Sequence, residues 1–144
     1  MKALVVYDSI YGNTEKIAQA IGGQVLRAGE VNPADLKGFD LLIVGSPTHG
    51  GRPTEGVHGL LESSLALEGV NVAAFDTKTV SKWNRLLRFG YAAPRIARSL
   101  ERKGGNLLAP PEGFAVLGIK GPLKDGELER AANWVKGMTI GQLR

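Results

Sequence analysis

The stretch that decides the fold reads Ser9-Ile10-Tyr11-Gly12-Asn13-Thr14-Glu15. It follows an apolar run at residues 3–7, typical of a buried strand, and precedes a helix-like run at residues 16–21. The first amides of a helix have no partner within it, and the helix dipole favours an anion at that end. Hydroxyl groups at Ser9 and Thr14 add donors, and Gly12 lets the backbone approach a bound group closely. The stretch therefore predicts a phosphate-binding loop.

A plain strand-to-helix turn is the alternative interpretation, with Asn13 or Thr14 capping the helix. The loop also resembles the phosphate loop of the flavodoxin family, which reads Ser/Thr-x-Thr/Tyr-Gly-Asn-Thr and holds the phosphate of flavin mononucleotide (FMN). The matching positions are Ser9, Tyr11, Gly12, Asn13 and Thr14. This resemblance implies that FMN is the cofactor and that the whole loop, Ile10 included, contacts it.

Composition limits what the protein can be. The chain has 144 residues, the commonest size of one domain and enough to bury a core without metals or disulfides. It contains no cysteine, which excludes disulfides, thiolate zinc sites and cysteine nucleophiles. His49 and His58 have no further ligands nearby, so no metal site is expected. No run approaches the ~18 apolar residues of a membrane span, and the N-terminus does not read as a signal peptide. We therefore expect one cytoplasmic domain over residues 1–144.

Apolar and helix-like runs alternate along the chain. Strands are expected at residues 2–7, 24–26, 40–45 and 70–75, with a last strand split between 106–108 and 114–117. Helices are expected at residues 14–21, 54–64, 93–103 and 127–136. Leu41-Leu42-Ile43-Val44 is apolar without alternation, which is typical of a parallel strand buried on both faces. The pattern predicts an α/β fold, a flavodoxin-like doubly wound five-stranded parallel sheet with helices on both faces. Its expected order, 2-1-3-4-5, is the one that flavodoxin itself exemplifies.

A second loop follows the expected strand at residues 40–45 and suits a rigid backbone platform. It reads Gly45-Ser46-Pro47-Thr48-His49-Gly50-Gly51. The flavodoxin family has Gly-x-Pro-Thr and then an aromatic residue here. The resemblance implies that the flavin ring is flanked by Pro47, Thr48, His49, Gly50 and Gly51. His49 stands where many members have Trp, and the alternative is that it is an exposed loop histidine.

A third loop begins Asp76-Thr77-Lys78 after the expected strand at residues 70–75. The resemblance is looser here and implies that these three residues lie along another edge of the flavin ring. Beyond them the chain is longer than a minimal flavodoxin would require. The ring could be covered by any of three aromatic residues, Trp83, Phe89 or Tyr91, and the sequence does not choose among them.

Positive charge is concentrated in one segment. The net charge is +4, but residues 78–103 contain eight basic residues against one acidic residue. Within them, residues 81–89 have the spacing of a short helix with one basic and one apolar face. This face is either a solvated surface over the core or a docking surface for an acidic partner or an anionic membrane. No nucleic-acid-binding module is recognisable, so no specific nucleic-acid partner is expected.

The resemblance covers essentially the whole chain and implies an electron-transfer protein whose FMN cycles between oxidised, semiquinone and hydroquinone forms. Typical flavodoxins are strongly acidic, whereas this chain is basic, so its redox partner is expected to be acidic. Two alternatives stay open. One is a flavin-dependent reductase, either a quinone reductase or a protoporphyrinogen-oxidase-like enzyme, and the other is a flavin-free docking module that uses residues 78–103. No catalytic residue is assigned, and both a monomer and a homodimer remain open.

Overall fold

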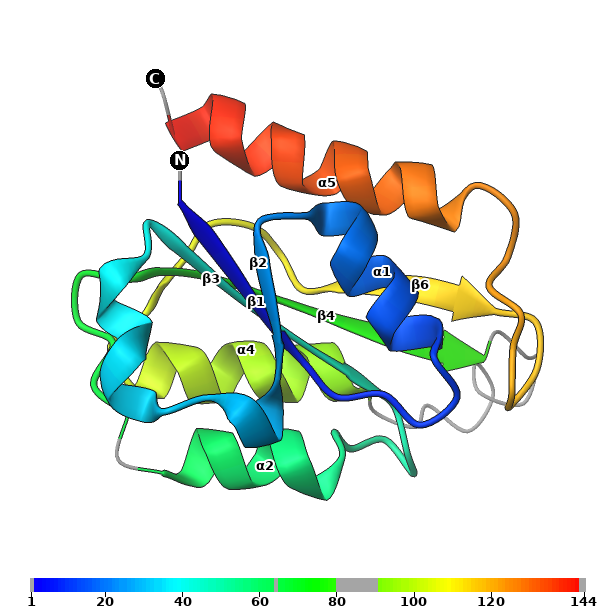
Figure 1. The fold of residues 1–144 in the computed structure, drawn as a ribbon, viewed down its shortest axis with the longest axis horizontal. Coiled ribbons are helices and arrows are strands. Elements are labelled where there is room, and N and C mark those ends of the chain that lie inside the picture. The colour runs from blue at the N-terminus through cyan, green and yellow to red at the C-terminus, as the bar shows by residue number, and fades with distance from the viewer. Residues whose placement is uncertain (1, 64, 80–90, 143–144) are drawn as a thin grey trace.

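The computed structural model describes residues 2–63, 65–79 and 91–142 and shows a parallel sheet between two layers of helices (Figure 1). The strands are β1 (Ala3–Tyr7), β2 (Gln24–Arg27), β3 (Leu41–Pro47), β4 (Asn71–Thr79), β5 (Asn106–Leu107) and β6 (Glu112–Val116). They are arranged in the order β2-β1-β3-β4-β5, β6 also pairs with β4, and every pairing is parallel. The predicted α/β fold and strand order are confirmed, with β6 as an additional strand.

The last strand position is shared by two short strands. β5 pairs with the beginning of β4, at Asn71 and Val72. β6 pairs with the end of β4, from Phe75 to Thr79. Between them lie Pro110 and Pro111, which have no backbone N–H to donate to a ladder. The split that the sequence predicts is therefore real, and β6 begins two residues before the expected start at residue 114.

In the part of the chain that the structure describes, two α-helices cover each face of the sheet. α1 (Asn13–Ile21) and α5 (Glu127–Gln142) lie on one face, and α2 (Glu55–Glu62) and α4 (Ala92–Arg102) lie on the other (Figure 1). α5 continues six residues beyond its expected end at residue 136. Two 3₁₀ helices that the sequence did not predict, Ala28–Glu30 and Pro33–Gly38, connect β2 to β3. Among the described residues no helix has both the length and the apolar content needed to cross a membrane.

Both faces of the central strands are buried, which explains their unbroken apolar sequences. In β3, Leu42 and Val44 pack towards α2 and α4, whereas Leu41 and Ile43 pack towards α1 and α5. Neighbouring side chains of a strand point to opposite faces, so a strand covered on both sides needs apolar residues at every position.

Gly45 lies beneath an aromatic cluster at the end of β3. Phe75, Phe114 and Trp134 make edge-to-face contacts with ring centroids 6.0–6.3 Å apart. A Cβ atom at Gly45 would lie 2.0 Å from Cζ of the Phe75 ring, well inside van der Waals contact. The absence of a side chain at residue 45 therefore lets the far end of this ring pack against the strand.

We expect Gly45→Ala to lower the free energy of unfolding by about 1–3 kcal/mol, because the added methyl group overpacks a rigid aromatic core. Urea denaturation measures the change. Gly59→Ala is the matched control, since a Cβ at this position of α2 meets nothing within 4 Å and alanine favours a helix. Equal stability of Gly45→Ala and the wild type would contradict the role assigned to Gly45.

Candidate functional site

A pocket lies at the carboxyl edge of the sheet, where the loops after β1, β3 and β4 meet. Eleven of the fourteen site residues predicted from the sequence line it: Ser9, Ile10, Tyr11, Asn13, Thr14, Pro47, Thr48, His49, Gly50, Thr77 and Lys78. Gly12, Gly51 and Asp76 do not line it. The topology thus brings residues from three distant parts of the chain together, and their contact with a cofactor stays a prediction.

Three further lining residues were missed by the sequence analysis: Thr79, Val116 and Ile119. Ile119 belongs to the loop between β6 and α5, and its side chain is 76% exposed. This loop reaches the pocket because the Asn13 side chain donates a hydrogen bond to the Lys120 carbonyl at 3.3 Å. The available signal was Ile119, an apolar residue between Gly118 and Lys120, beyond the end of the last expected strand.

The loop after β1 is a tight turn into α1. Gly12 is the N-cap residue, with φ of +88°, and no side chain caps the helix. The alternative in which Asn13 or Thr14 caps the helix is therefore wrong. The Gly12 amide donates to Ser9 Oγ at 3.0 Å, which leaves the Ser9 hydroxyl proton available for another acceptor. Thr14 is buried, and its hydroxyl lies 2.7 Å from that of Thr77, so it joins the loops after β1 and β4.

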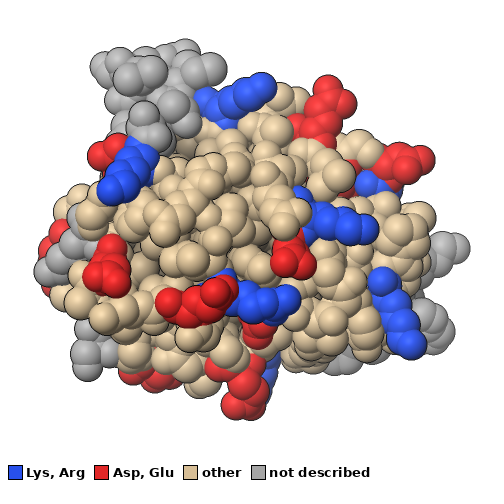
Figure 2. All heavy atoms as spheres, in the orientation of Figure 1, with Lys and Arg blue, Asp and Glu red and all other residues tan. Residues whose placement is uncertain are grey.

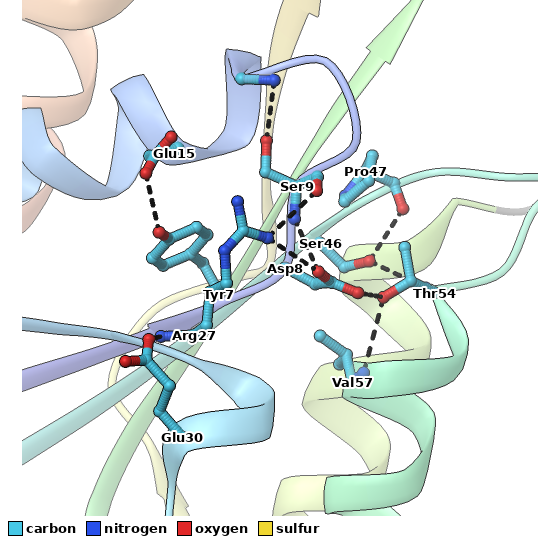
Figure 3. Close-up of polar contacts among 11 residues, drawn as sticks. Tyr7, Asp8, Ser9, Glu15, Arg27, Glu30, Ser46, Pro47, Thr54 and Val57 are labelled. Carbon is cyan, nitrogen blue, oxygen red and sulfur yellow. Dashed lines mark hydrogen bonds and ion pairs between the residues drawn. The ribbon is translucent and has the colours of Figure 1, made fainter.

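Asp8 connects the loops after β1 and β3 (Figure 3). Its Oδ1 accepts hydrogen bonds from the Ser9 amide at 2.9 Å and from Arg27 Nη1 at 3.3 Å. Its Oδ2 accepts a 2.5 Å hydrogen bond from the Thr54 hydroxyl, and the Thr54 amide donates to Ser46 Oγ at 2.9 Å. Sequence reasoning missed Asp8, whose only signal was a carboxylate directly before the phosphate-type loop.

A second contact holds the start of α1 against β1. The Tyr7 hydroxyl donates to Glu15 Oε1 at 2.9 Å, and the Arg27 guanidinium lies over the Tyr7 ring, 5.2 Å from its centroid (Figure 3). Burial and the Glu15 carboxylate together raise the pKa of Tyr7. The ring therefore stays neutral and serves as a fixed donor for the first turn of the helix.

The loop after β3 forms a two-residue turn at the mouth of the pocket. The His49 amide donates to the Arg52 carbonyl at 2.8 Å, and the Arg52 amide donates to the His49 carbonyl at 2.9 Å. Gly50 and Gly51 lie between them with φ of +55° and +78°, the positive values that a type I′ turn requires. His49 is exposed and also lines the pocket, and its place beside the flavin ring stays a prediction.

Asp76 lies behind the pocket rather than in its wall. Its side chain is 1% exposed, and Oδ2 accepts a hydrogen bond from the Ala93 amide at 2.8 Å. Thr48 Oγ1 accepts from the Ala92 amide at 3.1 Å. Tyr91, the N-cap residue of α4, makes no side-chain capping bond. The side chains of Thr48 and Asp76, which belong to other elements, therefore accept from the first amides of this helix in its place. Burial raises the pKa of Asp76, against the lowering effects of the Ala93 amide and the Lys78 charge.

Lys78 is held at the pocket wall by an aromatic ring. Its ammonium lies 3.9 Å from the centroid of the Tyr91 ring. Tyr91 was one of three aromatic residues proposed to cover the flavin, and it contacts a lining residue without lining the pocket itself. The other two, Trp83 and Phe89, lie outside the described residues, as does the short helix expected at residues 81–89.

Comparisons with known proteins agree with this fold. A family model described as Flavodoxin matches residues 5–134, and no curated protein matches the sequence. A flavodoxin from the domain Archaea has a TM-score of 0.81 at 24% identity, over all of both chains. Flavodoxin 1 from Bacillus cereus has a TM-score of 0.78 at 17% identity, over 97% of this chain and 98% of that one. Rubredoxin oxygen:oxidoreductase from Desulfovibrio gigas has a TM-score of 0.73 at 21% identity, over 97% of this chain but 35% of that one. These solved structures share the fold.

The buried Asp76 carboxyl makes stability depend on pH. Because its pKa is higher in the folded chain than in the unfolded chain, the folded state binds this proton more tightly. The free energy of unfolding therefore gains a contribution as pH falls through the raised pKa towards the ordinary carboxyl value of about 4. We expect Asp76→Asn to lose this contribution, so that its stability relative to the wild type is higher at neutral pH than at acidic pH.

Urea denaturation of the two proteins over a range of pH measures the difference. Asp35→Asn, which changes an exposed carboxylate, is the control and is expected to follow the wild type. A constant difference in stability between Asp76→Asn and the wild type at every pH would rule out the role assigned to Asp76.

Proposed function

This chain belongs to the flavodoxin family, and we propose that it carries electrons with FMN bound in the pocket between the loops after β1, β3 and β4. Flavodoxins bind FMN, and FMN is the cofactor of this chain. The observation that carries the proposed site is the shared pocket, because the residues expected to bind the phosphate and the ring come from three loops that are distant in sequence. The electron-carrier role is preferred to the reductase and flavin-free alternatives, and a cytoplasmic location stays a prediction.

The loop after β1 suits a phosphate group. The first amides of α1 have no partner within the helix, and its dipole favours a negative charge at this end. Gly12, at the N-cap, places no side chain in front of these amides. The Ser9 hydroxyl has a proton left to donate, because its oxygen already accepts from the Gly12 amide. Together these groups offer several donors to one anion without a charged side chain.

The loops after β3 and β4 suit the flat ring of the cofactor. When bound, FMN supplies one- and two-electron redox chemistry, which amino-acid side chains in this pocket do not provide. The Thr48 amide donates to the Thr77 carbonyl at 2.9 Å and so keeps the two loops at a constant separation. Glycine at residues 50 and 51 leaves their peptide free to present either its N–H or its C=O towards the pocket. His49 offers an imidazole face at the pocket edge.

The first test is the visible absorption spectrum of the purified protein, followed by titration of FMN into the stripped apoprotein. We expect flavin bands and stoichiometric uptake.

In Ser9→Ala the Gly12 amide loses its acceptor and the phosphate loses one donor, so the affinity for FMN should fall roughly tenfold or more. Ser99→Ala on α4 is the matched control, because Ser99 does not line the pocket. A colourless protein that takes up no FMN would refute the proposed function.

Lys78 is expected to set part of the reduction potential. Lys78 lines the pocket, and a nearby positive charge stabilises negative charge added on reduction. Lys78→Gln should therefore make the potential of the last reduction step more negative by tens of millivolts, on the order expected for one partly screened charge. Potentiometric titration measures the shift, with Lys136→Gln on α5 as the control for loss of one exposed charge. An unchanged potential in Lys78→Gln would show that this charge does not act on the cofactor.

A further inference from the structure

A groove of about 450 Å³ runs between α2 and α4, on the face of the sheet opposite to α1 and α5. It is separate from the pocket described above, and none of its lining residues lines that pocket. Its charged lining residues are Arg52, Glu55, Glu62, Arg95, Arg98 and Arg102.

The sequence of α4 explains why three of these arginines share one side of a helix. Arg95, Arg98 and Arg102 recur at intervals of three and four residues, which is the helical repeat, and all three are exposed. Ile96 and Leu100 face the sheet and are fully buried. With a rise of 1.5 Å per residue, the row of arginines extends about 10 Å along the groove.

The guanidinium groups of the groove carry uncompensated charge. Four arginines and two glutamates line the groove, which leaves a net charge of +2. Within the described part of the chain, none of these four arginines forms an ion pair, whereas Arg27 and Arg130 both do. Figure 2 shows one face of the molecule, on which basic and acidic side chains both occur. The groove is therefore a surface that is ready to accept carboxylates.

The groove begins beside the cofactor pocket. Arg52 lines the groove, and His49 lines the pocket. Two backbone hydrogen bonds, of 2.8 and 2.9 Å, join these residues across the turn at Gly50 and Gly51. A protein seated in the groove therefore lies one short turn away from the pocket.

We propose that this groove docks the redox partner through an acidic helix on the partner's surface. This inference rests on the proposed function in one respect: the docked protein is assumed to be an electron donor or acceptor. Carboxylates one helical turn apart would match the row of arginines, and guanidinium groups bind carboxylates in a planar, two-point geometry. This surface has the opposite sign to that of an acidic flavodoxin, so it selects against basic partners.

The test uses the FMN-loaded protein and a helical peptide with glutamates at every third and fourth position. Nuclear magnetic resonance titration reports both affinity and the residues that the peptide contacts. We expect chemical-shift changes along α2 and α4 and at least tenfold weaker binding in the Arg95→Gln/Arg98→Gln double variant. The matched control, Lys124→Gln/Lys136→Gln, removes two exposed charges outside the groove and should bind like the wild type.

Three results would overturn the docking proposal: equal binding of a peptide with glutamine in place of glutamate, unchanged affinity in the double variant, or displacement of the peptide by micromolar inorganic pyrophosphate. The last would assign the groove to a small phosphate compound. The visible spectrum of the same samples separates the two proposals. If the protein contains flavin but does not bind the peptide, only the docking proposal is overturned. If the protein contains no flavin but binds the peptide, the electron-transfer proposal is overturned and the binding of an acidic helix in the groove stands.

Discussion

Parallel pairing of β1, β3 and β4 is the constraint on which the site depends. Strands that run in the same direction end at the same edge of a sheet, so the loops that follow them meet there. β1 pairs with β3, and β3 pairs with β4, without an intervening strand. The pocket is therefore a consequence of strand order. The sequence of each loop then determines only which groups that loop presents to the pocket.

Hydrogen bonds between loops turn this proximity into a defined shape. The Thr14 and Thr77 hydroxyls join the loops after β1 and β4 in a buried position, where an unpaired hydroxyl would be costly. The Asp8 carboxylate joins the loops after β1 and β3 through the Thr54 hydroxyl. Each of the three loops is therefore hydrogen-bonded to at least one of the others.

Charge distinguishes this chain within a common fold. Among the described residues, the pocket proposed for the cofactor has one lysine in its lining, Lys78, whereas four arginines line the groove between α2 and α4. A fold supplies the position of a site, but the charges on the surrounding helices determine which partners can approach it.

Local patterns in the sequence predicted the fold and most of the residues that line the pocket. Unbroken apolar runs such as Leu41-Leu42-Ile43-Val44 indicate strands buried on both faces. Gly12 and the Gly50-Gly51 pair indicate turns, because these turns require a positive φ that glycine adopts readily. Both signals depend on residues that are adjacent in the sequence, so they can be recognised without the tertiary structure.

Only the tertiary structure decided the long-range contacts. Asp76 caps α4 from a neighbouring strand, and Ile119 reaches the pocket because Asn13 binds a carbonyl 107 positions away. The Asp8 carboxylate accepts a hydrogen bond from the hydroxyl of Thr54, which is 46 positions away in the sequence. Such pairs leave no periodic trace in the sequence, since their meeting depends on how the sheet twists and how the helices pack against it.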